Sequence, residues 1–130
     1  MDEKFHRGWL RPPIKHHNIM GACNFSDIGI AKTANEAYRE LCDEAEYEYG
    51  HDSYNGTIST THGFSKASGN PRFGTKAFYD WQDKKEDNMD KGDCRYVEVT
   101  GAKAKEMKNR YGYKSRRGLK VFYFFGIARE

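Results

Sequence analysis

The stretch LKVFYFFGIA, residues 119–128, decides the fold of this chain. It is nearly continuous in apolar residues, and its valine, phenylalanine, tyrosine and isoleucine residues favour β-structure. A run of this kind is typical of a strand that lies at the centre of a sheet and is buried on both faces. The rest of the chain should therefore supply neighbouring strands and amphipathic helices that cover the sheet.

The first predicted helix lies well upstream of this strand. It begins at the capping box Thr33-x-x-Glu36, and Gly50 suits a left-handed C-cap. Between these ends, apolar residues recur at helical spacing: Ala34, Tyr38, Leu41, Ala45 and Tyr49. Residues 36–48 also carry six acidic residues against the lone Arg39, so the outer face of this helix should be strongly negative.

Two further helices are predicted. One covers residues 75–87, with four residues that should pack inward: Ala77, Phe78, Tyr79 and Trp81. The other is short and basic, covers residues 101–112, and can be capped by Thr100.

Shorter segments predict the remaining strands. The sequence CRYVEV, residues 94–99, alternates as a strand should. A turn at Asn55-Gly56 leads into TISTT, residues 57–61, which is also β-favouring. Residues 65–74 read as a loop, and residues 14–25 could hold a short strand.

Together these elements predict one small α+β domain, with a mixed or antiparallel sheet and about three helices on one side of it. The domain should cover residues 14–130. Residues 1–13 are predicted to be an N-terminal arm that ends at Pro12-Pro13, because this pair bars a helix there. A length of 130 residues is enough for one modest core.

The charge is small but unevenly distributed. A net charge of +3 does not by itself imply a nucleic-acid partner. Residues 103–120 carry eight basic residues against the lone Glu106, in contrast to the acidic residues 36–48. The two segments could pair within one chain or between subunits, or the basic face could stay free, so the formation of a homo-oligomer is left open.

The cysteines and the apolar runs indicate the compartment. Cys23, Cys42 and Cys94 form no C-x-x-C pair, which is typical of reduced thiols in a cytosolic protein. No apolar run is long enough for a membrane span, and the charged N-terminus lacks the hydrophobic block of a secretion signal. A cytoplasmic protein without a membrane partner is therefore predicted.

The polar stretch GHDSYNGTISTTHGF, residues 50–64, is the first candidate for a ligand site. Its hydroxyl groups and its glycine turn offer hydrogen-bond donors and a close approach of the backbone, which suit a phosphate or a sugar. The candidate residues are Asn55, Gly56, Thr57, Ser59 and Thr61. An edge strand rich in threonine would give the same pattern, because threonine favours β-structure.

The basic segment would supply the other half of this site. Tyr111 and Tyr113 lie among lysines and arginines, an arrangement that suits stacking on a nucleotide base or on single-stranded nucleic acid. Arg116 and Arg117 would neutralise a phosphate. A solvated helix face, docked on the acidic helix, accounts for the same charges.

A catalytic alternative uses His51, Asp52 and His62. Thr61 places a hydroxyl beside His62, as nucleophilic catalysis requires. The histidines match no recognised metal-binding spacing, and a pair of solvated loop histidines accounts for them equally well. No metal and no cofactor is predicted.

The segment EYEYGHDSYNGTIST resembles a group of small accessory proteins of tailed bacteriophages, in which an acidic helix runs into a Gly-His-Asp-x-Tyr-x-Gly-Thr-Ile motif. The matching residues are Gly50, His51, Asp52, Tyr54, Gly56, Thr57 and Ile58. The resemblance implies a phage protein that acts in the host cytoplasm and blocks host enzymes or counters host defence by binding.

Three functions follow from these patterns. The leading one is a non-enzymatic, phage-type binding protein that captures a phosphorylated small molecule, such as a nucleotide-like signal, or inhibits a host protein or defence factor. The second is a hydrolase or transferase that acts on a nucleotide or nucleic acid through the two histidines and Asp52. The third is an inhibitor whose acidic residues 36–48 mimic nucleic acid.

Overall fold

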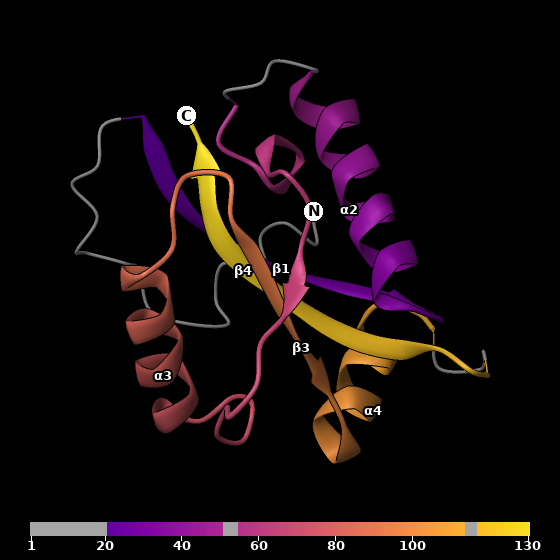
Figure 1. Ribbon diagram of the computed structural model, residues 1–130. Coiled ribbons are helices and arrows are strands. Elements are labelled where there is room, and N and C mark those ends of the chain that lie inside the picture. The colour runs from indigo at the N-terminus through magenta and orange to yellow at the C-terminus, as the bar shows by residue number, and fades with distance from the viewer. Residues whose placement is uncertain (1–20, 51–54, 114–116) are drawn as a thin grey trace.

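The computed structural model describes residues 21–50, 55–113 and 117–130 (Figure 1). In chain order the elements are β1 (Ala22–Ala31), α2 (Ala34–Tyr49), the 3-10 helix η2 (Ile58–Thr60), β2 (Ser65–Lys66), α3 (Lys76–Asp87), β3 (Cys94–Val99), α4 (Gly101–Arg110) and β4 (Lys120–Arg129). The strands of this described part form one sheet in the order β1-β4-β3-β2. β4 pairs antiparallel with β1 and β3, whereas β2 pairs parallel with β3. The prediction of a small α+β domain with a mixed sheet and three α-helices is confirmed.

β4 is the central strand that its sequence predicts, and every residue from Val121 to Ala128 is buried. Its side chains alternate between two apolar clusters. Tyr123, Phe125 and Ile127 pack in the cluster that holds Phe78 of α3 and Met107 of α4. Phe122 and Phe124 pack in the cluster that α2 covers.

The helices therefore cover both faces of the sheet, and the prediction that they lie on one side is wrong. A strand that is apolar throughout needs cover on each face, because water would otherwise meet one row of its side chains. α2 covers one face, and α3 and α4 cover the other, as Figure 1 shows.

α2 begins and ends where its sequence predicts. The Thr33 hydroxyl accepts a hydrogen bond from the Glu36 N–H, and Gly50 ends the helix with a φ of 88°. The buried residues are Ala37, Leu41 and Ala45, whereas Tyr49 is 47% exposed, so the predicted stripe is displaced by part of a turn. The small Ala37 faces Gly29 of β1, and this pair lets the helix approach the strand closely.

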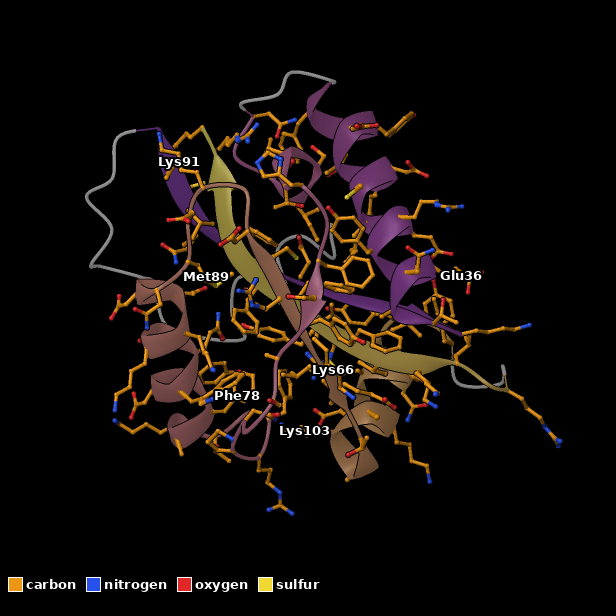
Figure 2. All side chains as sticks on the ribbon, viewed as in Figure 1. Glu36, Lys66, Phe78, Met89, Lys91 and Lys103 are labelled. Atoms are coloured by element: carbon orange, nitrogen blue, oxygen red, sulfur yellow. The ribbon has the colours of Figure 1, made fainter. Side chains whose placement is uncertain are left out.

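α3 differs from its prediction in which side chains it buries. Phe78 is fully buried and points from α3 toward the sheet (Figure 2), but Ala77 is exposed. Gln82 and Glu86 are buried instead, and they continue a chain of hydrogen bonds from the sheet. The Tyr123 hydroxyl donates to Gln82 Oε1 at 2.8 Å, and Gln82 Nε2 donates to Glu86 Oε2 at 3.1 Å.

Two strand predictions also change. The strand expected within residues 14–25 begins at Ala22 and runs on to Ala31, and residues 57–61 form no strand. They hold η2, because the Asn55 and Thr57 side-chain oxygens accept bonds from backbone N–H groups two residues on and so fold the chain into tight turns. The short β2 lies where a loop was expected.

Candidate functional site

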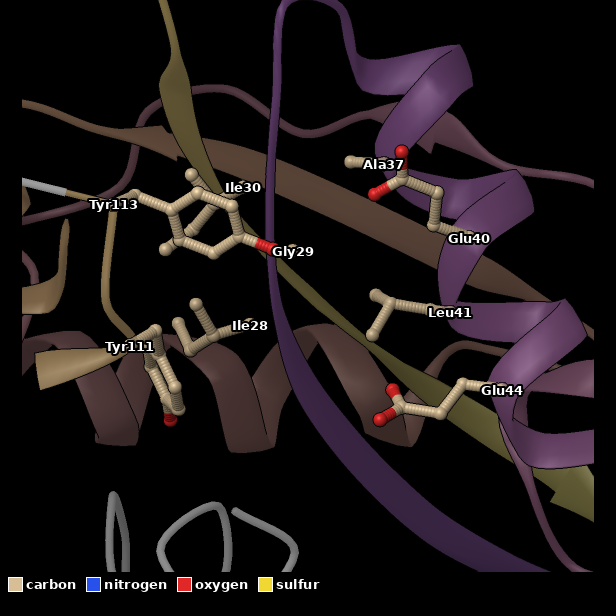
Figure 3. A pocket seen from close by; sticks show the side chains of 9 residues that line it. All are labelled: Ile28, Gly29, Ile30, Ala37, Glu40, Leu41, Glu44, Tyr111 and Tyr113. Atoms are coloured by element: carbon tan, nitrogen blue, oxygen red, sulfur yellow. The ribbon is translucent and has the colours of Figure 1, made fainter. Parts of the chain in front are cut away.

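Two adjoining cavities lie along β1, between this strand and α2, and Figure 3 shows the first of them. We call them together the β1 groove, and they share Leu41 and Glu44 as lining residues. The first cavity has a volume of about 370 Å³ and is also lined by Ile28, Gly29, Ile30, Ala37, Glu40, Tyr111 and Tyr113. The second has a volume of about 230 Å³ and continues along β1 past Asp27 and Phe25 toward Glu48, Gly56 and Thr57.

The floor of the groove is an edge strand. β1 pairs with β4 along one side, and within the described residues no strand pairs with its other side. In an antiparallel ladder, alternate backbone N–H and C=O groups point away from the partner strand. Such groups of β1 therefore lie on the groove side of the strand, where Ile28 and Ile30 are only 5% and 7% exposed.

The two walls of the groove differ in chemistry. Glu40, Glu44 and Glu48 follow one another at four-residue spacing along α2, and all three are exposed. Tyr111 and Tyr113 form the opposite wall, pack partly buried against the core, and lie across β1 from the carboxylates in Figure 3. Carboxylates that face aromatic rings attract cationic groups, by ion pairing and by cation–π contact.

The hydroxyl groups predicted to bind a ligand in residues 55–61 form hydrogen bonds within the chain instead. Asn55 Oδ1 accepts from both the backbone N–H and the hydroxyl of Thr57, and Thr57 Oγ1 lies 2.8 Å from Ser59 Oγ. The Thr61 hydroxyl donates to the Ile58 carbonyl and lies 2.6 Å from the Tyr38 hydroxyl. These contacts hold η2 in shape and connect it to α2.

The structure does not bring the two halves of the predicted ligand site together. Thr60 Oγ1 accepts a hydrogen bond from the Arg129 N–H, which fixes η2 at the C-terminal end of β4. Arg117 precedes the N-terminal end of that strand and is exposed, so about 30 Å of strand separates it from η2. Arg116 lies outside the described residues.

Four of the predicted residues nevertheless line the β1 groove, at its two ends. Tyr111 and Tyr113 lie at one end, and Gly56 and Thr57 at the other. Between them lies part of the acidic face that the sequence predicts for residues 36–48. The four-residue spacing of Glu40, Glu44 and Glu48 was visible in the sequence, but only the structure shows which strand these residues accompany.

Of the catalytic alternative, only His62 lies within the described residues. It is exposed, its backbone N–H donates to the Gly92 carbonyl at 2.9 Å, and its ring contacts the Arg129 guanidinium. His51 and Asp52 lie outside the described part of the chain. In that part, no group of three histidine, cysteine, aspartate or glutamate side chains could hold a metal ion.

The pKa values of all three cysteine thiols are raised. Burial raises the pKa of the Cys42 thiol to about 11, and the nearby Glu46 and Asp43 carboxylates add to the shift, while a hydrogen bond with Tyr38 opposes it. Burial also raises the pKa of Cys23 and, well above its usual value, that of Cys94. A thiol needs a lowered pKa to act as a nucleophile near neutral pH, so these residues serve packing.

A separate cavity of about 660 Å³ lies where the N-termini of α3 and α4 meet. It is lined by Arg72, Lys103, the N-cap residues Thr75 and Thr100, and Glu98. Figure 2 shows Lys103 near this end of the molecule. Helix N-termini and basic side chains both attract anions, although Glu98 opposes this.

No protein-family model matches this chain, and comparisons with curated proteins and with solved structures find no match either. No described helix combines the length and the apolar character that crossing a membrane requires.

Proposed function

We propose that this chain is a non-enzymatic binding protein whose β1 groove holds a positively charged segment of a partner protein. The observation that carries the proposal is the groove itself, in which an edge strand lies between three glutamates and two tyrosines. Complementary charge steers such an encounter and selects against the wrong partners.

The same charges favour a protein over a phosphorylated ligand in this groove. Glu40, Glu44 and Glu48 would repel a nucleotide or the backbone of a nucleic acid. They suit a basic partner, such as a host protein that itself binds nucleic acid, and in that case the acidic α2 would act as a mimic of nucleic acid. The resemblance to small phage accessory proteins supports a host protein or defence factor as the target.

Photo-crosslinking in bacterial cells tests this proposal. Tyr113 lines the groove, and we would replace it with the photoreactive residue p-benzoylphenylalanine. Tyr47 lies on α2, is 91% exposed and is absent from the groove lining, so the same replacement there is a matched control. We expect the probe at position 113 to capture a protein through a lysine- or arginine-rich segment, and the control probe to capture none of it.

Two results would count against the proposal. One is a protein adduct that forms equally well from both positions, because the groove would then have no part in capture. The other is the recovery of nucleotide or nucleic acid alone from position 113.

A phosphorylated small molecule remains a second candidate, at the cavity between α3 and α4. Two helix N-termini with Arg72 and Lys103 favour it there. Calorimetric titration with inorganic phosphate and with a nucleoside triphosphate would detect such a site. The double variant Arg72→Glu and Lys103→Glu should abolish the heat of binding, whereas Glu44→Lys in the groove should leave it unchanged.

A further inference from the structure

The turn that leads into η2 contains a dipeptide, Asn55-Gly56, whose two residues can react with each other. Asparagine is among the thermolabile residues, because the backbone nitrogen of the next residue can attack its side-chain amide. Glycine obstructs this attack least, since it has no Cβ, and Asn55 is the only asparagine in the sequence that precedes a glycine. We infer that Asn55 is a site of spontaneous covalent modification, which the folded turn suppresses until η2 opens. This inference goes beyond the proposed function and does not rest on it.

The modification of Asn55 requires no co-reactant other than water and its hydroxide. The Gly56 N–H gives its proton to hydroxide, and the nitrogen forms a bond to Cγ of Asn55. The Cγ–Nδ2 bond breaks, and Nδ2 takes up a proton and leaves as ammonia. The cyclic imide that remains then adds water and opens at one of its two C–N bonds. The products are aspartate and isoaspartate, and in isoaspartate the main chain runs through the side-chain carbonyl.

The fold holds the side-chain amide of Asn55 by all of its hydrogen-bonding positions. Oδ1 accepts from the backbone N–H of Thr57 at 3.1 Å and from its hydroxyl at 2.7 Å. Nδ2 donates to the Gly50 carbonyl at 3.1 Å and to the Ser59 hydroxyl at 3.4 Å. An asparagine amide has two acceptor and two donor positions, so none is left over. A turn of the amide toward the Gly56 nitrogen would break bonds on both its oxygen and its nitrogen.

The attacking nitrogen is held as well. The Gly56 N–H donates to the Arg129 carbonyl at 2.7 Å, and the Arg129 N–H donates to the Thr60 hydroxyl at 2.9 Å. These two bonds attach η2 to the end of β4, and the proton that the reaction must remove lies in the first of them. The nitrogen and the amide are released together when η2 separates from β4, which is a local opening rather than the unfolding of the sheet.

The modified turn cannot regain the bonds that it has lost. An aspartate at position 55 has no donor, so its carboxylate would face the Gly50 carbonyl that now accepts from Nδ2. An isoaspartate lengthens the main chain by one methylene group, which shifts Gly56 relative to Arg129. Gly56 and Thr57 line one end of the β1 groove, so the reaction would permanently alter that end in molecules whose turn has opened.

Peptide mass spectrometry tests the inference in the full chain. The protein would be kept at pH 8 in native buffer and in urea, in water enriched in a heavy isotope of oxygen, so that only products formed during the incubation carry the label. We expect Asn55 to convert at least tenfold more slowly in native buffer than in urea. Asn70 precedes Pro71, which has no N–H to lose, so this asparagine is an internal control that should convert in neither. Equal rates would overturn the suppression, and no conversion of Asn55 in urea would overturn the site itself.

Two matched variants distinguish local opening from unfolding of the whole chain. Thr57→Val removes the hydroxyl that donates to Asn55 Oδ1, and Thr75→Val removes the hydroxyl that caps α3. We expect Thr57→Val to speed the conversion at least fivefold in native buffer, and Thr75→Val to change it less than twofold. Equal acceleration in variants of equal stability to urea would overturn the control by η2. If Thr57→Val does not fold, Ser59→Ala takes its place, because it removes an acceptor of Nδ2.

Discussion

The close approach of α2 to β1 defines the groove, and the pair Gly29 and Ala37 allows a sharp test of it. A Cβ added to Gly29 would lie 2.9 Å from the Ala37 Cβ and 3.1 Å from Leu41 Cδ1. Ordinary contact between carbon atoms needs about 3.5–4.0 Å. The substitution Gly29→Ala must therefore push α2 outward by about 0.6–1.1 Å, since a Cβ atom cannot swing aside as the end of a leucine can.

The energetic cost follows from this overlap. Inserting a methyl group into a packed core costs about 1–3 kcal/mol, and we expect about 2 kcal/mol for Gly29→Ala. Ala37→Gly alone loses about 1 kcal/mol of helix propensity and about 0.8 kcal/mol for the buried methyl group. In the double variant the new methyl group fills the space that the other leaves. The double variant should then have a free energy of unfolding at least about 1 kcal/mol higher than the value expected if the losses of the two single variants were additive.

Urea denaturation of the wild type, Gly29→Ala, Ala37→Gly and the double variant measures the interaction energy between the two positions. Far-UV circular dichroism follows the helices, and the fluorescence of the partly buried Trp81 is one of the tertiary signals. With a slope of about 2 kcal/mol per molar urea, Gly29→Ala should lower the midpoint by about 1 M. Additive losses, or a Gly29→Ala protein as stable as the wild type, would refute the close contact between helix and strand.

Three further predictions concern stability and reactivity. Thr60→Val removes the acceptor for the Arg129 N–H and should lower the free energy of unfolding by about 1–3 kcal/mol in a urea titration. Tyr123→Phe leaves the buried Gln82 Oε1 without its donor and should cost about the same, whereas a loss below about 0.5 kcal/mol would show that the bond is not formed. Because the pKa of Cys42 is raised to about 11, a thiol reagent at pH 8 should modify it about 100-fold more slowly in the folded than in the unfolded protein. The unfolded thiol ionises first as the pH rises above about 9, because its pKa is lower than that of the folded protein. The contribution of Cys42 to the free energy of unfolding therefore falls as the pH rises from about 9 to about 11.

Much of the fold could be predicted from the sequence, because local rules and tertiary packing agree over most of it. The apolar run in residues 119–128 is found as the buried β4, and the capping box at Thr33 starts α2. The prediction failed at residues 57–61, where a β-favouring composition competes with side-chain hydrogen bonds from Asn55 and Thr57. Propensity alone carries no information about that competition.

The site was harder to predict, because it depends on which elements become neighbours. The sequence predicts Tyr111 and Tyr113 as aromatic partners for a base, and the structure places them in the lining of a cavity that also holds Glu40 and Glu44. The acidic row on α2 was visible, but its relation to an edge strand depends on the order of strands in the sheet. That order is a long-range property, and no local pattern encodes it.

The position of the acidic charge favours a binding site over a purely protective surface. An exposed edge strand risks pairing with other chains, and proteins protect it with charged residues or a proline on the strand, or by covering the edge with a helix or loop. β1 holds no proline, and Asp27 is its only charged residue. The charge lies on α2 instead, where it repels a second acidic copy. A surface that only had to prevent aggregation would gain more from charges on the strand, whereas carboxylates beside the strand suit a basic partner.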